Sequence, residues 1–250
     1  MSESKKMRKD VGGKVTESKV FSELIEGGVE RPASITLMGG PGTGKTYVAL
    51  NFLWNGLRNG ETCVYICASQ PPRNARRTMR SLKWDFEPYE EEGKLIFVDA
   101  YPGRVGKPDG EYYIEDPYDT TLYGGLMSTL KEDEVNPDRI VFDSLTSLCS
   151  QFEPGDVMRV LKRMQGYMES LSAVGLFVGE EGCLHSQAEA MLMHGGDVTL
   201  HTDRGEEGRT VEVLRSREGP HEHPKAKIEI RSKGGGVRLS NLRKSQENDV

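Results

Sequence analysis

A glycine-rich segment that ends in lysine is the chemically most specific stretch of the sequence. Residues 39–46, GGPGTGKT, fit the pattern G-x-x-x-x-G-K-[S/T] and lie between a run typical of a strand and a run typical of a helix. Glycines let backbone N–H groups curl around phosphate oxygens, and a helix N-terminus adds partial positive charge. We therefore expect the phosphates of a nucleotide to be bound by Gly39, Gly40, Pro41, Gly42, Thr43, Gly44, Lys45, Thr46 and Tyr47, with Lys45 on the β- and γ-phosphates.

A phosphate loop of this kind works with Mg²⁺, for which the sequence offers two oxygen ligands. The Thr46 hydroxyl is one, and Asp143 is the other, because it ends the apolar run Ile140-Val141-Phe142. Asp is also a favoured helix cap, so the alternative is that Asp143 caps the helix that follows.

The strand expected next to the phosphate loop has an unusual end. The stretch CVYICASQPP reads as a buried strand with a proline stop, and its tip is Ser69-Gln70, where an acid that activates water would be expected. Neither residue accepts a proton at neutral pH, although Gln70 can orient water by hydrogen bonding. Since loss of a general base typically costs about 10²–10⁴-fold in rate, we expect tight nucleotide binding with slow hydrolysis.

Two further acids are candidate substitutes for the absent one. Glu180 and Glu181 end the predicted strand that follows the helix after Asp143. Either of them would act on water or relay the nucleotide state. The alternative is a pair of solvated loop residues, since Glu is usually exposed.

Four arginines follow the two prolines at helical spacing. Arg73, Arg76, Arg77 and Arg80 would form one positively charged face of a helix. One interpretation is a solvated face paired with nearby acids such as those in YEEEGK. The other interpretation is a docking surface for an acidic partner such as a regulatory protein, for a neighbouring subunit or for nucleic acid. The exposure of this surface would depend on nucleotide state.

Apolar runs and helical patterns alternate along the chain and must position these residues. We expect strands at 34–38, 62–67, 95–98, 140–142 and 175–178, and helices at 45–59, 73–82, 119–132 and 155–173. This rhythm indicates an α/β fold with a largely parallel sheet flanked by helices. From about residue 198, the runs VTLHT, TVEVLRS, KAKIEIRS and GGVRLS predict antiparallel strands added to the sheet edge.

Composition narrows the class of protein. The 250 residues, 36% of them hydrophobic and 29% charged, suit one globular domain, which we place at 18–242 between a flexible arm at 1–17 and a flexible tail at 243–250. No apolar run approaches the roughly 20 residues that a membrane helix needs, and no secretory signal is recognisable, so we expect a cytoplasmic protein. The net charge of −6 makes nucleic acid an unfavoured partner. The cysteines show no C-x-x-C pairing, and His221 and His223 do not form an expected metal site.

Four segments in the same order resemble the KaiC-like branch of the RecA superfamily, notably its archaeal single-domain members. They are FSELIEGGVERPASITLMGGPGTGKT with its Gly27-Gly28 pair, LKWDFEPYEEEGKLIFVDA, RIVFDSLTSL and TVEVLRSREGPHEHPKAKIEIRSKGGGVRL. The resemblance covers nearly the whole chain after the arm. It implies a RecA-like ATP-binding core whose nucleotides lie between neighbouring subunits, commonly in hexameric rings.

The resemblance also implies roles for two pairs of residues. A Lys-x-Arg step in the family reaches the neighbouring subunit's γ-phosphate, and the matching residues are Arg215-Ser216-Arg217. A charged strand edge is the alternative. The Glu-Glu pair by which the family activates water falls on Ser69 and Gln70. Ser186 has no adjacent Ser-Thr pair, so autophosphorylation as in the clock member is not expected.

Three functions remain open on the sequence. The leading interpretation is a regulatory or signalling ATPase that assembles with itself and switches partners with nucleotide state. The second is a non-hydrolysing ATP-dependent scaffold, like the KaiC-like component of the archaeal motility motor, which the absent Glu pair favours. The third is a recombinase-like DNA-dependent ATPase, which the acidic composition disfavours.

Overall fold

Strands and helices alternate along the chain up to its last third. The computed structural model describes residues 29–149, 152–183, 186–206, 208–217, 225–230 and 236–241. The helices are α2 Lys45–Arg58, α3 Pro72–Ser81, α4 Glu87–Glu91, α5 Thr120–Glu132, α6 Leu145–Cys149, α7 Pro154–Leu171 and α8 Ser186–Gly195. The strands are β1 Ala33–Gly39, β2 Cys63–Cys67, β3 Leu95–Asp99, β4 Tyr112–Tyr113, β5 Arg139–Asp143, β6 Val174–Val178, β7 Val198–Gly205, β8 Gly208–Ser216, β9 Lys225–Ile230 and β10 Val237–Asn241.

Within these residues the strands form one sheet in the order β10-β9-β8-β7-β1-β6-β5-β2-β3-β4. The strands from β7 to β4 are parallel, and β8, β9 and β10 continue the sheet as antiparallel neighbours. The expected α/β fold with a largely parallel sheet and C-terminal antiparallel strands is therefore confirmed. The strand that contains VTLHT, β7, joins the two parts, because it pairs antiparallel with β8 as expected and parallel with β1, which was not expected.

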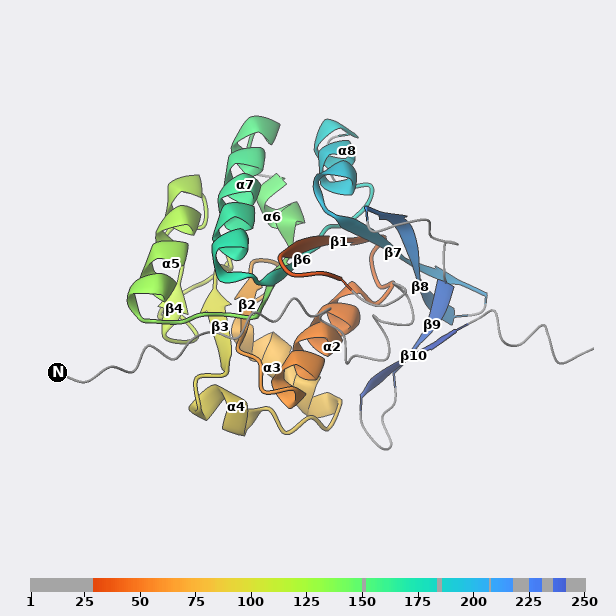
Figure 1. Ribbon diagram of the computed structural model, residues 1–250, viewed down its shortest axis with the longest axis horizontal. Coiled ribbons are helices and arrows are strands. Elements are labelled where there is room, and N and C mark those ends of the chain that lie inside the picture. Colours follow the sequence, from red (N-terminus) through yellow and green to blue (C-terminus); the bar gives the residue numbers. More distant parts are fainter. Residues whose placement is uncertain are drawn as a thin grey trace, which may run out of the picture.

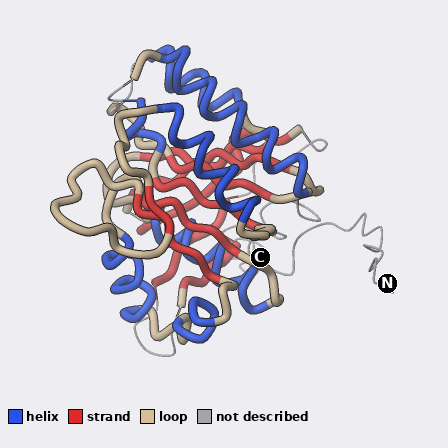
Figure 2. Tube along the Cα trace, turned by 90° about the vertical axis from the view of Figure 1, so that its left-hand side faces the viewer, coloured by secondary structure: helices blue, strands red, loops and turns tan. Residues whose placement is uncertain are grey.

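Helices cover both faces of the sheet (Figures 1 and 2). The helices α2, α3 and α4 lie on one side, and α5, α6, α7 and α8 lie on the other. The helical faces expected to be apolar are buried, including Phe52 and Leu53 of α2 and Val160 and Met164 of α7. All five residues of β2 and all five of β5 are buried, as expected for parallel strands between two helical layers.

The short elements were not predicted. The helices α4 and α6 have 5 residues each, too few for a 3.6-residue period to emerge above chance. The two-residue strand β4 lies inside the segment taken to be irregular. The helix α8 was also missed.

Some expectations lie outside the described residues. These are the N-terminal arm and the C-terminal tail, the Gly27-Gly28 pair, and His221 and His223. Among the helices that the structure describes, none is both long and apolar enough to cross a membrane.

The strand order brings several chain segments to one edge of the sheet. Parallel strands end at the same edge, and the neighbours β1, β6, β5 and β2 are followed there by four different loops. In α/β proteins this edge is where ligands bind.

Candidate nucleotide site

The four loops at this edge carry the residues selected from the sequence. The phosphate loop follows β1, Glu180 follows β6, Asp143 ends β5, and Ser69 and Gln70 follow β2. Positions that are far apart in the chain are thus brought together by the sheet.

The phosphate loop has the shape that an anion site needs. Gly44 caps α2 with φ 109°, a left-handed conformation that favours glycine. No side chain caps α2 by a hydrogen bond, and no acid lies in its first turn. A Cβ at Gly39 would lie 2.3 Å from the Thr202 carbonyl oxygen, so only glycine fits there. The first N–H groups of α2 therefore suit phosphate oxygens.

Lys45 folds back over its own loop. Its Nζ donates to the carbonyl oxygens of Gly39 at 2.8 Å and Gly40 at 2.7 Å, and it lies 3.7 Å from Glu180 Oε2. Burial lowers the pKa of Lys45, an effect that the charges of Glu180 and Asp143 oppose. The ammonium group is held at the loop by carbonyl and carboxylate oxygens. Tyr47, predicted with the phosphate site, packs against the hydrophobic core on the α2 side.

Asp143 is buried and accepts hydrogen bonds from three hydroxyl groups. Its Oδ2 accepts from Tyr65 at 2.6 Å and Thr46 at 3.1 Å, and its Oδ1 accepts from Ser69 at 3.2 Å. Burial raises the pKa of Asp143, whereas these hydrogen bonds and the charge of Lys45 act in the opposite direction. Thr46 and Asp143 thus lie together, and two hard oxygen donors beside a phosphate loop fit Mg²⁺.

The tip of β2 presents no carboxylate to this site. Ser69 is turned to Asp143 by its hydroxyl, and its N–H donates to the Asp143 carbonyl oxygen at 3.0 Å. Gln70 is half-buried, and its side chain has no hydrogen-bond partner in the part of the chain that the structure describes. Of the two residues, Gln70 is therefore the one with a free polar group.

The two acids after β6 have different surroundings. Glu180 lies beside Lys45, whereas Glu181 pairs with His201 Nε2 at 3.1 Å. The backbone N–H of Glu180 donates to Thr146 Oγ1 at 2.8 Å, which fixes the loop. Only Glu180 therefore directs its carboxylate to the phosphate loop.

Sequence reasoning missed one cation at the site. Arg209, near the start of β8, donates from Nε to the Gly42 carbonyl oxygen at 3.0 Å, and its Cδ would lie 3.2 Å from a Cβ on Gly44. The contact arises because β8 pairs with β7, which itself pairs with β1. No local pattern around Arg209 signals it.

Arg215 and Arg217 lie at the end of the strands that is opposite the phosphate loop. Thr202, opposite Gly39, marks the phosphate-loop end of β7, whereas Arg215 pairs with Thr199 towards the other end. Arg215 Nη1 donates to the carbonyl oxygens of His194 and Gly196 at the end of α8. These residues cannot reach the phosphate loop of their own chain across the length of β8.

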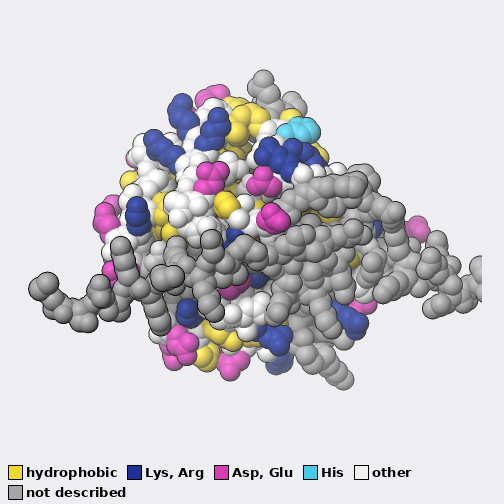
Figure 3. Space-filling view, viewed as in Figure 1, with side chains coloured by type: hydrophobic (Ala, Val, Ile, Leu, Met, Phe, Trp, Pro, Cys, Tyr) yellow, Lys and Arg dark blue, Asp and Glu magenta, His cyan; other side chains and the backbone are white. Residues whose placement is uncertain are grey.

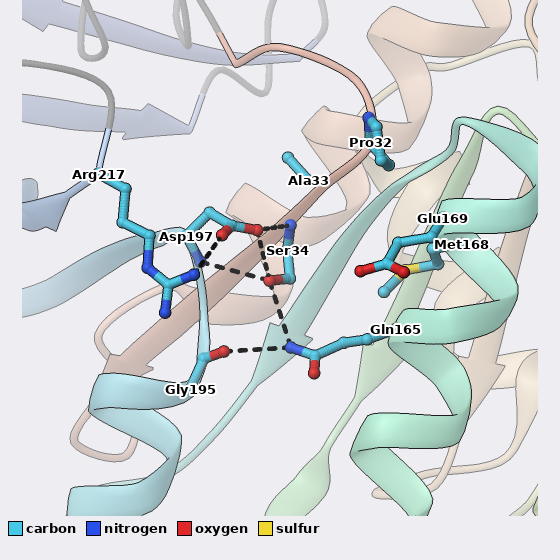
Figure 4. Close-up of a pocket in the computed structure, with 9 residues that line it drawn as sticks. All are labelled: Pro32, Ala33, Ser34, Gln165, Met168, Glu169, Gly195, Asp197 and Arg217. Atoms are coloured by element: carbon cyan, nitrogen blue, oxygen red, sulfur yellow. Dashed lines mark hydrogen bonds and ion pairs between the residues drawn. The ribbon is translucent and has the colours of Figure 1, made fainter.

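Arg217 borders a polar cavity of about 220 Å³ at that edge. Figure 4 shows its side chain turned to Asp197, 3.1 Å away, while Glu169 of α7 projects from the other side. Asp197 Oδ2 accepts from both the N–H and the hydroxyl of Ser34. The cavity thus has one paired cation on one wall and a carboxylate on the other.

The four arginines of α3 do not form one free face. Arg76 pairs with Glu90 and Asp109 and lies over the Phe97 ring at 4.6 Å, and Arg80 pairs with Glu87 at 2.8 Å. The docking prediction was thus wrong for Arg76, because a half-buried guanidinium with two carboxylates is not available to a partner. Arg73 and Arg77 are exposed. On the face in Figure 3, charges of both signs are mixed.

Comparison with known proteins identifies relatives over most of the chain. The family model described as "ATPase: KaiC" matches residues 16–241. UPF0273 protein PH0284 of Pyrococcus horikoshii is 30% identical over 85% of this chain and 88% of its own length. UPF0273 protein PF1931 of Pyrococcus furiosus is 30% identical over 86% and 89%, and a UPF0273 protein of Thermotoga maritima is 28% identical over 86% and 90%.

A solved structure shares the fold. The crystal structure of the KaiC-like protein PH0186 from Pyrococcus horikoshii matches 92% of this chain and 96% of its own chain, with a TM-score of 0.68 and 24% sequence identity. At this identity the match supports the fold alone.

Proposed function

The chain belongs to the KaiC family of ATPases, and from this premise we propose that it is an ATP- and Mg²⁺-dependent regulatory switch that assembles with itself and hydrolyses ATP slowly. The observation that carries the proposal is a phosphate loop with Thr46 and Asp143 beside it, combined with a β2 tip that lacks an acid. The Lys45 ammonium group contacts the phosphate loop, and the Thr46 hydroxyl contacts Asp143. The β2 tip, by contrast, supplies no base, because its residues are Ser69 and Gln70.

The phosphate loop supports nucleotide binding by three independent features. The start of α2 has no competing side-chain cap, Lys45 is poised at the loop, and Arg209 adds a second cation beside Gly42. On binding, the Lys45 ammonium group would exchange carbonyl and carboxylate oxygens for the β- and γ-phosphates.

Thr46 and Asp143 would hold Mg²⁺, which would supply positive charge to neutralise the phosphates. The chain's own contribution is to keep both oxygens 3.1 Å apart at the loop. The burial of Asp143 strengthens any charge interaction there, because the local dielectric is low.

Slow hydrolysis follows from the groups available to water. Gln70 can orient a water molecule but cannot accept its proton. Glu180 is the acid best placed to take over, because its carboxylate lies 3.7 Å from the Lys45 ammonium group.

Self-assembly is supported by the position of Arg215 and Arg217. Guanidinium groups at the edge opposite the phosphate loop can serve a nucleotide only on another subunit. A head-to-tail contact of this kind forms a ring where the rotation between subunits closes, and we propose a hexamer, as is common in the family. A cytoplasmic location and a protein partner that contacts Arg73 and Arg77 complete the proposal.

The test is the mass of the native assembly with no nucleotide, with ADP and with ATP, with released phosphate followed in the same samples. We expect ATP to change the assembly and turnover to stay well below about one per second, within the slow range of known enzymes. Lys45→Ala should bind no ATP and should assemble as the nucleotide-free protein does. Turnover near one per second or faster that Lys45→Ala abolishes would contradict the slow switch. ATP-dependent assembly with no phosphate release at all would favour the scaffold function instead.

A further inference from the structure

Tyr65 makes a hydrogen bond that the general features of a phosphate-loop site do not require. Its side chain is fully buried, and its hydroxyl donates to Asp143 Oδ2 at 2.6 Å. The pairing of β2 with β5 explains the contact: Cys67 lies opposite Asp143, and Tyr65, two residues earlier, is on the same face. The phenol is long enough to reach forward to the carboxylate at the strand end.

The phenol has little freedom to do anything else. The Tyr65 ring packs edge-on against Phe97 of β3, with centroids 6.0 Å apart. The Tyr65 hydroxyl is the donor in this contact, because an ionised carboxylate can only accept a hydrogen bond. A locked donor on one carboxylate oxygen fixes the rotation of that carboxylate.

Ser69 completes the arrangement from the tip of the same strand. Its hydroxyl donates to Asp143 Oδ1 at 3.2 Å, so β2 supplies a donor to each carboxylate oxygen. Thr46 shares Oδ2 with Tyr65, and its hydroxyl is the proposed metal ligand. The hydroxyls of Tyr65 in β2 and of Ser69 just after it therefore each contact one carboxylate oxygen of the proposed ligand Asp143, and neither residue belongs to the phosphate loop.

We propose that Tyr65 and Ser69 are positioning residues that orient the Asp143 carboxylate for Mg²⁺. This inference rests on the proposed function, because it concerns the same metal site. Partners behind a metal ligand typically change metal affinity by about 10–100-fold. Without them the buried carboxylate loses its fixed orientation and two of its hydrogen bonds. The residue at the β2 tip would thus support the metal site instead of activating the attacking water.

The experiment compares ATP dissociation constants in EDTA and in saturating Mg²⁺, using a fluorescent ATP analogue. The ratio of the two constants measures how much Mg²⁺ strengthens binding. In Tyr65→Phe we expect the ratio to fall about tenfold, while affinity in EDTA stays within about twofold. Ser69→Ala should reduce the ratio by about threefold, because its bond is longer and its loss costs about one ordinary hydrogen bond.

The matched control is Tyr89→Phe, which removes the same atom from a ring that packs against Trp54 away from the site. Its ratio should equal that of the unaltered protein. Thermal unfolding of all variants separates loss of stability from loss of Mg²⁺ dependence. If Tyr65→Phe does not fold, Ser69→Ala carries the test, because Ser69 is exposed at a strand end.

Two results would overturn the inference. One is an unchanged ratio in both variants, and the other is equal weakening in EDTA and in Mg²⁺, which is what a purely structural role predicts. In both cases an unaltered protein that binds ATP leaves the proposed function intact. If the unaltered protein binds no ATP, the proposed function itself fails.

Discussion

The Lys45 ammonium group lies 3.7 Å from the Glu180 carboxylate, across the ends of β1 and β6. The same ammonium group donates to two carbonyl oxygens of the phosphate loop. Phosphate binding must therefore rearrange an ion pair that involves a loop from a different strand. We therefore expect the surroundings of Glu180 to change when nucleotide binds.

Exchange of Glu180 for Gln should separate the roles of the two neighbouring acids. If Glu180 acts on water, Glu180→Gln lowers the rate of phosphate release by about tenfold or more, within the range for a general base. Glu181→Gln is the matched control, because its carboxylate pairs with His201 away from Lys45, and it should stay within about twofold. Single-turnover phosphate release measures both. Equal losses in the two variants would exclude a special role for Glu180.

Restoring an acid at the β2 tip should speed hydrolysis. Gln70 is half-buried with a free side chain, so Gln70→Glu places a carboxylate where water activation is expected. We predict an increase of about tenfold or more in steady-state phosphate release. The double variant with Lys45→Ala should remain inactive, which identifies the site responsible. No increase in Gln70→Glu would mean that slow turnover has a cause other than the absent acid.

Mixing of two defective variants tests whether Arg217 acts on a neighbouring subunit. Lys45→Ala keeps Arg217 but lacks the phosphate contact, and Arg217→Ala has the reverse defect. Because these side chains lie at opposite edges of the sheet, a random mixture should form about a quarter of its interfaces with both groups intact. Phosphate release by the mixture should exceed that of either variant alone. Activity that never exceeds the sum of the parts would contradict a role across the interface.

Substitution of Arg76 and of Arg77, one position apart on α3, should change the stability of the protein by very different amounts. Arg76 is held by Glu90 and Asp109, both partly exposed, so Arg76→Ala should lower the free energy of unfolding by about 2 kcal/mol as it leaves two carboxylates without their cation. Arg77 is exposed, and Arg77→Ala should change it by less than about 0.5 kcal/mol. Urea unfolding measures both variants. A similar effect in the two would show that the ion pairs around Arg76 contribute nothing.

The sequence alone was sufficient to predict the parts of the site whose residues form a local pattern in the chain. A strand, a glycine loop and a helix are adjacent in the chain, so the geometry around Lys45 follows from neighbours in sequence. The apolar run before Asp143 likewise identified β5, and its contact with Thr46 follows from the position of both at the same sheet edge. Long periodic helices such as α7 were predicted for the same reason.

Features that depend on strand order could not be predicted. The contact of Arg209 with the phosphate loop requires β7 to lie beside β1, and the contact of Tyr65 with Asp143 requires β2 to lie beside β5. The pairing of Arg76 with Asp109 depends on a loop whose path has no periodic signal. Such long-range pairings are set by packing across the whole sheet, to which no single window of sequence is sensitive.

The strand β8 begins beside the phosphate loop of its own chain and ends at the residues proposed to serve a nucleotide on another subunit. Arg209 at its start contacts the phosphate loop, and Arg217 follows its end. At about 3.4 Å per residue, these two guanidinium-bearing positions are separated by about 27 Å of hydrogen-bonded strand. In a closed ring, each β8 would then rigidly connect two consecutive nucleotide sites. If ATP binding tilted β8 in one subunit, the spacing at the next site would change. The subunits of the ring would then be mechanically coupled, each through a single strand.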